Sequence, residues 1–455
     1  MSKNIAEKNT ELILNGNLVN AILSLSIPIV INNFIQTMYN LTDAYWLGKL
    51  GTADMAGISL VSPVQNMVIN FGQGITLAGS ILISQYIGAR DSKNARSMAS
   101  QIFVCSMIFS ITLAVICFFS TPGIVTWLGA EGDVFQRART YLQLVIFDLP
   151  FLFIINIFTA VSQAQGNTIR PMFLNLFGIV LNMFLDPFFM IMLDLGIAGA
   201  AFATVLAKIP CAAVGLYFLT RKGNEVYLEF KNFRFEKSKL LNIVRIGLPT
   251  AIGGSTMQFG FLLMTKNVLE FGDDAMAAYG IGNRINGIIT MPSNAVGSAV
   301  ATIVGQNMGA DNIERAEEAY KRARIMIVAF LFAGGMIMSR GIVSTFMVSI
   351  FSKDSNVIPM AADFLAIMAF WCWTNGIHNT TTGLFQGTGN TLYTMVIEAA
   401  RLWIFRFASL FILKTVFGME ERSVWFSVVI SNGISAFILW VLYRMGLWRK
   451  NKATL

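Results

Sequence analysis

The chain has 455 residues, of which 55% are hydrophobic and only 13% are charged, and its mean hydropathy is +0.62. Soluble globular domains carry about 25% charged residues, so this composition excludes a soluble protein and indicates an all-α polytopic membrane protein. The net charge of +8 is accounted for by basic loops between the spans, so nucleic-acid binding is not expected.

Apolar runs long enough to cross a hydrocarbon core of about 30 Å predict about twelve transmembrane helices. The alternating ten-residue segments that are typical of a membrane β-barrel are absent. The expected spans lie at 18–47, 53–84, 95–121, 137–163, 168–191, 196–220, 240–269, 275–304, 319–345, 357–383, 391–416 and 423–446.

Lys and Arg are concentrated in the predicted loops on one side of the membrane. They cluster at 90–96, 221–245, 315–324 and 444–452, whereas the opposite loops hold few basic residues. Because basic loops stay in the cytoplasm, we expect a multi-pass plasma-membrane protein with both termini cytoplasmic. The polar N-terminal segment lacks the pattern of a cleavable signal peptide, so the first span is expected to act as its own insertion signal.

The longest polar segment, at 221–245, separates six predicted spans from six. Two motifs recur in the halves: QYIGARD at 85–91 matches QNMGADN at 306–312, and QAQGNT at 163–168 matches QGTGNT at 386–391. Units with an even number of spans enter the membrane in the same direction, as in transporters built from parallel repeats. The expected organisation is an N-terminal six-helix lobe, a cytoplasmic linker, a C-terminal six-helix lobe and a basic cytoplasmic tail, at 1–220, 221–239, 240–446 and 447–455.

Two acidic residues, Asp43 and Asp186, lie near the ends of the first and fifth apolar runs. A charged side chain inside a membrane span is costly and therefore indicates a functional site. Asn182 precedes Asp186 by four residues, so the amide and the carboxylate project from one face of a helix. Pro187 has no N–H to donate to the carbonyl of Met183. These oxygens predict a site for a hard cation or a proton.

Two further polar residues are expected at a similar depth in the membrane. At about 1.5 Å per residue, Thr204 in the sixth span and Asp148 in the fourth reach the level of Asp43 and Asp186, in the outer half. The corresponding positions of the second half carry no acid. We therefore expect the coupling site inside the N-terminal lobe, with Asp148 as an additional candidate.

In these features the chain resembles the multidrug and toxic compound extrusion (MATE) transporters of the MOP flippase superfamily. The resemblance rests on twelve spans in two sixes, the polar central loop, the repeated turn motifs, and Pro28 and Asp43 in the first span. It is nearest to the DinF-type branch, in which the positions of Asp43, Asn182, Asp186 and Thr204 form the cation site.

The resemblance implies efflux of amphiphilic, often cationic compounds in exchange for sodium ions or protons. It also implies a V-shaped pair of lobes that opens alternately to each side, with the first helix bending near Pro28. The NorM-type branch carries acids in its seventh and tenth helices. Here the seventh span has Gln258 and no acid until its end, so a cation site in the second lobe is not expected.

The C-terminal lobe has charged and titratable residues of its own in predicted spans. Glu398 and Arg401 are three residues apart and are expected to pair. Arg284 and Arg406 have no partner visible in the sequence and are suited to an anionic substrate group, which would favour a flippase for an anionic lipid-linked precursor. His378 is expected to be a buried histidine with satisfied hydrogen bonds rather than a proton carrier.

The sequence contains no nucleophile triad, no His and Cys metal cluster and no GxxxxGK[ST] nucleotide loop. We therefore expect neither an enzyme nor ATP-driven transport, and no cofactor or metal apart from the coupling ion. A passive channel, which would conduct without an opposing cation gradient, and a membrane-embedded enzyme are the alternatives from other classes. The expected partners are a small amphiphilic substrate and the lipid bilayer, the chain acting as a monomer. Four tryptophans are interpreted as interface anchors, namely Trp127, Trp371, Trp373 and Trp448.

Overall fold

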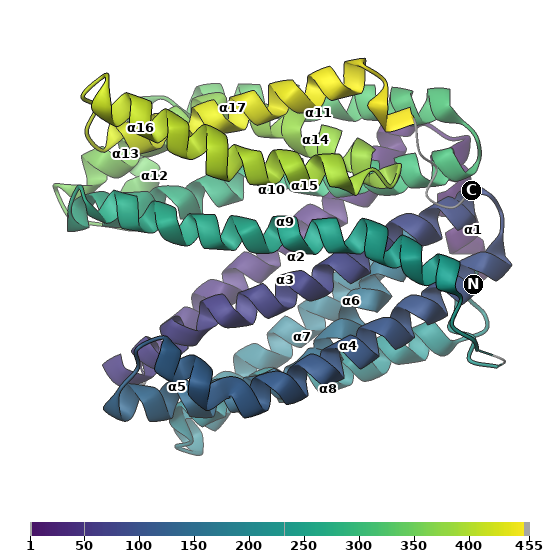
Figure 1. Cartoon of the computed structure of the whole chain (residues 1–455), viewed down its shortest axis with the longest axis horizontal. Helices are drawn as coiled ribbons and strands as arrows, with labels where there is room; N and C mark the ends of the chain where they lie inside the picture. Colours follow the sequence, from purple (N-terminus) through teal and green to yellow (C-terminus); the bar gives the residue numbers. More distant parts are fainter. Residues whose placement is uncertain (1, 50, 232, 450–455) are drawn as a thin grey trace. The chain divides into compact units, whose positions relative to one another are not determined.

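The computed structural model describes residues 2–49, 51–231 and 233–449, and every regular element in these ranges is a helix (Figure 1). The last residues of the expected basic tail, 450–455, lie outside the described residues. The first half contains α1 (Ser2–Leu14), α2 (Leu18–Leu47), α3 (Thr52–Gly88), α4 (Ser92–Trp127), α5 (Gly132–Val145), the 3-10 turn η1 (Ile146–Asp148), α6 (Leu149–Ala164), α7 (Ile169–Pro187), the π-helical η2 (Phe188–Met192) and α8 (Gly196–Thr220).

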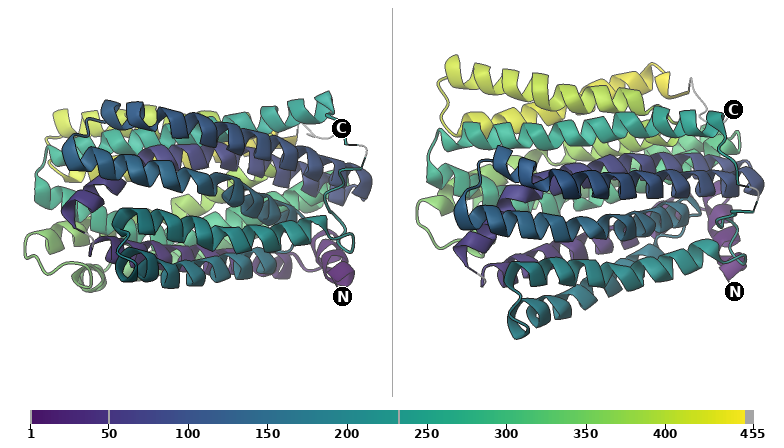
Figure 2. Two further views of the ribbon diagram at one scale, coloured as in Figure 1. Left: turned by 90° about the horizontal axis from the view of Figure 1, so that it is seen from below. Right: turned by 60° about the horizontal axis from the view of Figure 1, so that its bottom comes forward.

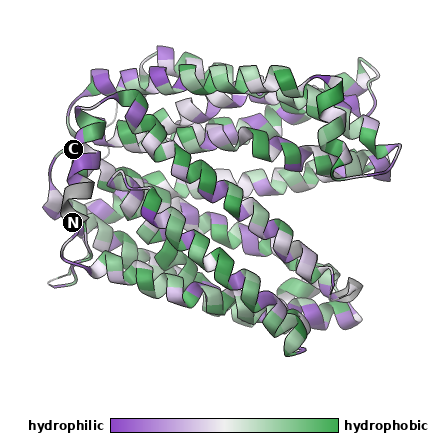
Figure 3. Ribbon diagram, turned by 180° about the vertical axis from the view of Figure 1, so that it is seen from behind, coloured by the Kyte–Doolittle hydropathy of each residue, from purple (hydrophilic) through white to green (hydrophobic). Residues whose placement is uncertain are grey.

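The second half contains α9 (Lys237–Leu269), α10 (Asp273–Gly309), α11 (Ile313–Met338), α12 (Gly341–Ser349), α13 (Val357–Trp371), α14 (Trp373–Gly387), α15 (Thr391–Ala400), the π-helical η3 (Arg401–Arg406), α16 (Phe407–Thr415), α17 (Arg422–Arg444) and the 3-10 turn η4 (Leu447–Arg449). Within each half the long helices run side by side in every view (Figure 2). Apolar residues predominate along them (Figure 3).

Eight helical segments of the described chain are long and apolar enough to cross a membrane, and two bent pairs raise the number to ten. The pairs are α11 with α12, bent by 83°, and α13 with α14, bent by 51°. Two more helical stretches, α9 and the run from α15 to α16, occupy the remaining expected spans. The prediction of an all-α polytopic membrane protein is confirmed.

The sequence did not predict the short helix α1, because this segment is mostly polar and only a small face of the helix is apolar. Ile13 and Leu14 at its end are buried, and Asn9 donates a hydrogen bond of 2.9 Å to the carbonyl of Gly166. The N-terminal segment is therefore part of the folded structure.

The repeated sequence motifs fold into repeated turns. Helix α3 ends before Arg90, whose φ is 57°, and α10 ends before Asp311, whose φ is 59°. The next residue caps the following helix in both copies: the Asp91 side chain accepts from the Asn94 backbone N–H, and the Asn312 side chain accepts from that of Arg315. Equal motifs thus give equal local structure, as a duplicated unit requires.

Contacts divide the chain into two compact units. Unit 1 comprises the residues up to Glu11 together with Pro28–Ala251, and unit 2 comprises Leu12–Ile27 and the residues from Ile252 onward. Helix α2 therefore changes unit at Pro28, and α9 changes unit after Ala251. A division at the central linker would instead leave the whole of α2 in the first unit and the whole of α9 in the second.

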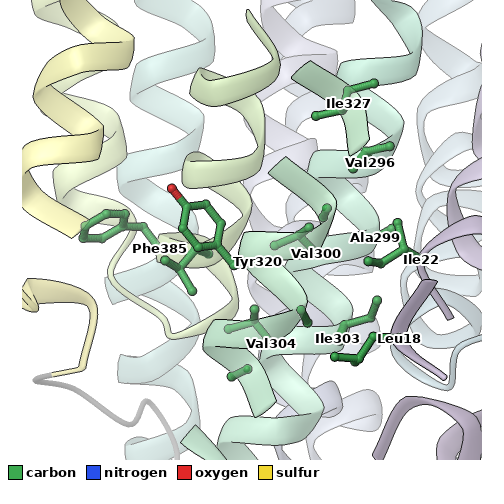
Figure 4. Close-up of a cluster of buried hydrophobic side chains, with 14 of the residues drawn as sticks. Leu18, Ile22, Val296, Ala299, Val300, Ile303, Val304, Tyr320, Ile327 and Phe385 are labelled. Carbon is green, nitrogen blue, oxygen red and sulfur yellow. The ribbon is translucent and has the colours of Figure 1, made fainter. Parts of the chain in front are cut away.

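The first part of α2 belongs to unit 2 because its apolar face is buried in that unit's core (Figure 4). Leu18 and Ile22 are 3% and 0% exposed and pack in one cluster with Val300 and Ile303 of α10. Trp448 joins the same cluster at 1% exposure, so its interpretation as an interface anchor is wrong. Trp127, by contrast, is 83% exposed.

Small residues set a close helix contact in unit 2, between α10 and α14. A Cβ atom built on Gly383 would lie 2.2 Å from the carbonyl oxygen of Gly297, and one on Gly387 would lie 2.6 Å from that of Ala301. Each helix thus presents two small residues four positions apart, the arrangement that lets backbones of membrane helices approach closely.

Candidate functional site

The carboxylate of Asp186 and the amide of Asn182 lie on the same face of α7, as their spacing predicts. Asn182 Nδ2 donates to Asp186 Oδ1 over 3.0 Å, and the two residues are only 3% and 1% exposed. The other oxygens, Asp186 Oδ2 and Asn182 Oδ1, are buried and have no hydrogen-bond partner among the described residues. Buried polar atoms are almost always paired, so these two oxygens are open to a partner from outside the chain.

The local sequence places this pair at the point where the regular helix stops. Helix α7 ends at Pro187, which has no N–H and therefore cannot continue the α-helical ladder. The chain then makes the π-helical turn η2, and single π-turns of this kind occur frequently at functional sites.

Helix α2 brings the second acid, Asp43, close enough to interact electrostatically with Asp186. Asp43 is half-buried and makes no hydrogen bond or ion pair within the described chain. One turn earlier on the same helix, Tyr39 interacts with both carboxylates and lies within hydrogen-bonding reach of Thr204 on α8. The structure therefore brings Asp43, Asn182, Asp186 and Thr204 into one cluster.

Two tyrosines complete the cluster, and sequence reasoning missed both. Tyr39 comes from α2, and Tyr141 on α5 is buried and interacts electrostatically with Asp43, Asp148 and Asp186. The spacing of Tyr39, four residues before Asp43, is a helical signal that could have indicated its position. Nothing in the sequence around Tyr141 indicates that contact.

Asp148 lies near this cluster but already has a partner. Its Oδ2 forms an ion pair and hydrogen bond with Lys208 Nζ on α8, and its side chain is only 2% exposed. An acid neutralised in this way contributes no net negative charge to the cluster. The structure thus separates Asp148 from the unpaired acids Asp43 and Asp186.

The atoms of the cluster that could bind a cation are all oxygens, from two carboxylates, one amide, one threonine hydroxyl and two phenols. Such ligands suit a hard cation or a proton. Among the described residues, no group of three or more His, Cys, Asp or Glu side chains is arranged to hold a metal ion. The arrangement can therefore take up a single positive charge between Asp43 and Asp186, next to the two unpaired oxygens.

Unit 2 contains a different cluster, around Glu398 at the end of α15. Glu398 Oε2 lies 2.6 Å from Arg401 Nη2, so the expected ion pair is present. Glu398 Oε1 lies 2.7 Å from His378 Nε2, and His378 Nδ1 lies 3.2 Å from Ser435 Oγ. His378 is 1% exposed, and both of its ring nitrogens have partners.

The two remaining arginines of unit 2 differ in their surroundings. Arg406 is buried, donates to Ser431 Oγ over 3.1 Å and to Asn432 Oδ1 over 3.3 Å, and lies over the ring of Phe261. Arg284 is exposed and has no hydrogen bond or ion pair within the described chain. Neither arginine pairs with a carboxylate of the described residues.

A family model described as MatE matches the chain twice, over residues 28–188 and 249–412. Among curated relatives, the probable multidrug resistance protein YpnP of Bacillus subtilis is 24% identical over 438 residues, which are 96% of this chain and 97% of that protein. The multidrug export protein MepA of Staphylococcus haemolyticus is 25% identical over 93% of each chain.

Solved structures show the same fold. A multidrug resistance MATE family transporter in an outward-facing conformation matches with a TM-score of 0.92 and 24% identity, covering 98% of this chain and 99% of that one. A MOP superfamily transporter from Pyrococcus furiosus, whose description reports reversed polarity of the binding pocket, matches with a TM-score of 0.88 and 25% identity over 98% and 99% of the chains.

Proposed function

Because the chain belongs to the MatE family of membrane transporters, matched in both of its halves, we propose that it is a secondary antiporter exporting amphiphilic, cationic drugs or toxic metabolites. Transport proceeds by alternating access in exchange for a proton or a sodium ion. The protein works as a monomer in the plasma membrane, with both termini in the cytoplasm. The names of the curated relatives, multidrug resistance and multidrug export proteins, support the substrate class.

The observation that carries the coupling mechanism is the pair of unpartnered buried oxygens, Asp186 Oδ2 and Asn182 Oδ1. An ionised carboxylate in a buried site is unfavourable unless a positive charge compensates it. Binding one cation at Asp43, Asn182, Asp186 and Thr204 removes that cost, and Tyr39 contributes its hydroxyl.

Cation binding acts on the transporter through α2. Asp43 lies on the part of α2 that belongs to unit 1, while the residues before Pro28 belong to unit 2. A charge change at Asp43 therefore alters the conformational preference of a helix shared by both units. Since a ligand shifts an equilibrium only through differential affinity, the state with the tighter cation site becomes more populated when the cation binds.

Purified protein in liposomes tests the coupling. We load the vesicles with a fluorescent lipophilic cation and follow its movement under an imposed sodium gradient and, separately, a proton gradient. The wild type should respond to one of the two gradients, which identifies the coupling ion. Asp186→Asn should lose gradient-driven movement, because the neutral side chain no longer requires a compensating charge.

The matched control is Asp194→Asn, which makes the same charge change eight residues later in unit 1. Asp194 is exposed and has a φ of 51°, a conformation that asparagine tolerates well. This variant should transport like the wild type. Normal coupled efflux by Asp186→Asn, or equal losses in the two variants, would refute the proposed site.

The second candidate is a flippase for an anionic lipid-linked precursor. It is supported by the charges of unit 2, where Glu398 is outnumbered by Arg401 and Arg406 and a third arginine, Arg284, is exposed. In the same liposomes, this candidate requires that the lipophilic cation fails to move under either gradient. A fluorescent anionic lipid should then cross the bilayer in the wild type and not in Arg284→Gln.

A further inference from the structure

Unit 2 has a groove on its surface that the transport site does not use. It lies along α17 between the bent pair α13–α14 and α11, and its volume is about 550 Å³. Its apolar lining includes the side chains of Trp371, Trp373, Phe426, Phe437 and Trp440. We call it the aromatic groove.

The floor of the aromatic groove at Gly433 is open. A Cβ atom built on Gly433 would meet no heavy atom within 4 Å, so nothing in the described structure fills this space. Phe437 at the edge is 61% exposed and Trp371 is 39% exposed. In a chain that spans a membrane, accessible aromatic side chains of this kind can be contacted by the acyl chain of a lipid.

One end of the aromatic groove is basic. Arg324 of α11 lines it directly, and its guanidinium lies 5.8 Å from the ring centre of Tyr443 on the last turn of α17. Arg444, the last residue of α17, lies 5.6 Å from the ring centre of Trp440 in the groove. Two guanidinium groups therefore flank the same end.

Both of these arginines carry uncompensated charge. Within the described residues, Arg324 donates only to the hydroxyl of Tyr320, over 3.0 Å, and Arg444 forms no ion pair. Glu317, a carboxylate on the same helix, is already engaged by Lys321 at 2.7 Å and by Arg449. The basic end is therefore available to an anion.

The position of Arg324 in the sequence fixes its depth. The residues of α11 before it include six charged side chains, whereas Ile325–Met338 contains none. Arg324 thus lies where the polar part of the helix meets the apolar part, which in a membrane is the level of the phosphate groups. Basic pockets between transmembrane helices at this level bind anionic lipid headgroups.

The dimensions of the groove fit one lipid chain. From Phe426 to Trp440 the groove follows α17 for about 21 Å, at 1.5 Å per residue. One leaflet of the hydrocarbon core is about 15 Å thick, so an acyl chain anchored at the basic end stays within the groove across its leaflet.

We propose that the aromatic groove binds an anionic phospholipid, with its phosphate held by Arg324 and Arg444 and one acyl chain lying along α17 past Gly433. The orientation proposed above makes this a lipid of the cytoplasmic leaflet. Two arginines favour an anionic over a zwitterionic lipid, because they repel the positively charged group in the zwitterionic headgroup. The phosphate of either lipid can accept paired hydrogen bonds from a guanidinium.

Tryptophan quenching tests the lipid preference. Three of the eight tryptophans line the groove. Full-length protein in phosphatidylcholine vesicles receives small amounts of either brominated phosphatidylglycerol or brominated phosphatidylcholine, whose bromines quench nearby tryptophan. Both probes also quench tryptophans that face the bulk lipid, to the same extent. The ratio of quenching by the two probes therefore measures the lipid preference of the groove. Each arginine is expected to contribute about fivefold, giving the anionic probe a preference of about twenty-five-fold.

Two variants distinguish the effect of the arginine charges from the effect of the open space in the groove. Arg324→Gln combined with Arg444→Gln should bring the preference close to one. Gly433→Phe should do the same without removing any charge, because the new ring occupies the open floor. The control is Gly334→Phe, at a position of α11 that is equally open and lines a second apolar groove with no basic residue. It should leave the preference unchanged.

Three results would overturn the proposal. The first is equal quenching by the two probes in the wild type. The second is a preference that Gly433→Phe leaves intact. The third is displacement of the brominated phosphatidylglycerol by a lipophilic cation in the wild type but not in Gly433→Phe, since this would make the groove a drug site. Loss of transport in Asp186→Asn is independent of all three.

Discussion

The substitution Gly383→Ala tests the close packing of α10 and α14. The new methyl group would lie 2.2 Å from the carbonyl oxygen of Gly297, whereas ordinary contacts are about 3.5 Å. The clashing atom is backbone, so one helix must move by roughly 1 Å to relieve the overlap. Overpacking of this kind costs about 1–3 kcal/mol. The higher helix propensity of alanine returns about 1 kcal/mol, so we expect a net loss of up to about 2 kcal/mol.

The measurement is thermal unfolding of the purified protein in detergent, followed by tryptophan fluorescence. The matched control is Gly280→Ala on α10, where a Cβ atom would meet nothing within 4 Å. This control should be neutral or stabilised by up to about 1 kcal/mol, since only propensity changes. If both variants shift the transition equally, or if Gly383→Ala stabilises the protein, the close approach of the two helices does not exist as described.

Three further substitutions probe other parts of the structure. Pro28→Ala supplies a helical N–H where α2 changes unit, so it should stiffen that helix and slow efflux in liposomes while leaving the unfolding temperature unchanged or raised. Asp148→Asn leaves the Lys208 charge unpaired, so the protein should lose about 3–5 kcal/mol, and adding Lys208→Met should recover part of the unfolding temperature. Asp91→Ala removes the cap of α4 and should cost about 1 kcal/mol. Hydrogen bonds from Asn94 lower the pKa of Asp91, so its contribution is present above the ordinary pKa of an aspartate, and the difference from the wild type should fade as the pH falls through the lowered value.

Short-range features of the structure could be predicted from the sequence. The i to i+4 spacing placed Asn182 beside Asp186, and the i to i+3 spacing placed Glu398 beside Arg401, because each pair lies on a continuous helical run whose periodicity fixes side-chain direction. The apolar runs located the helices, since a span must satisfy its own backbone hydrogen bonds.

Contacts between helices could not be predicted in the same way. Asp148 meets Lys208 across 60 residues, and Tyr141 joins the acid cluster from a different helix. Sequence spacing carries no information on such pairs, because they depend on how α5, η1 and α8 pack. The sequence could not predict the change of unit at Pro28 for the same reason. Helix α2 is continuous and apolar on both sides of the proline, and only tertiary contacts assign its two parts to different units.

The two units have used the same repeated architecture for different electrostatic arrangements. In unit 1 the ion pair of Asp148 and Lys208 is self-compensating, which leaves Asp43 and Asp186 as acids without a cation in the described structure. In unit 2 the acid Glu398 is paired with Arg401, and its other oxygen contacts His378. A site that already holds its counter-charge gains little from an external cation, whereas one with unpaired acids and orphan oxygens gains the most. The cation uptake that we propose is therefore assigned to unit 1, where the described acids Asp43 and Asp186 lack a counter-charge.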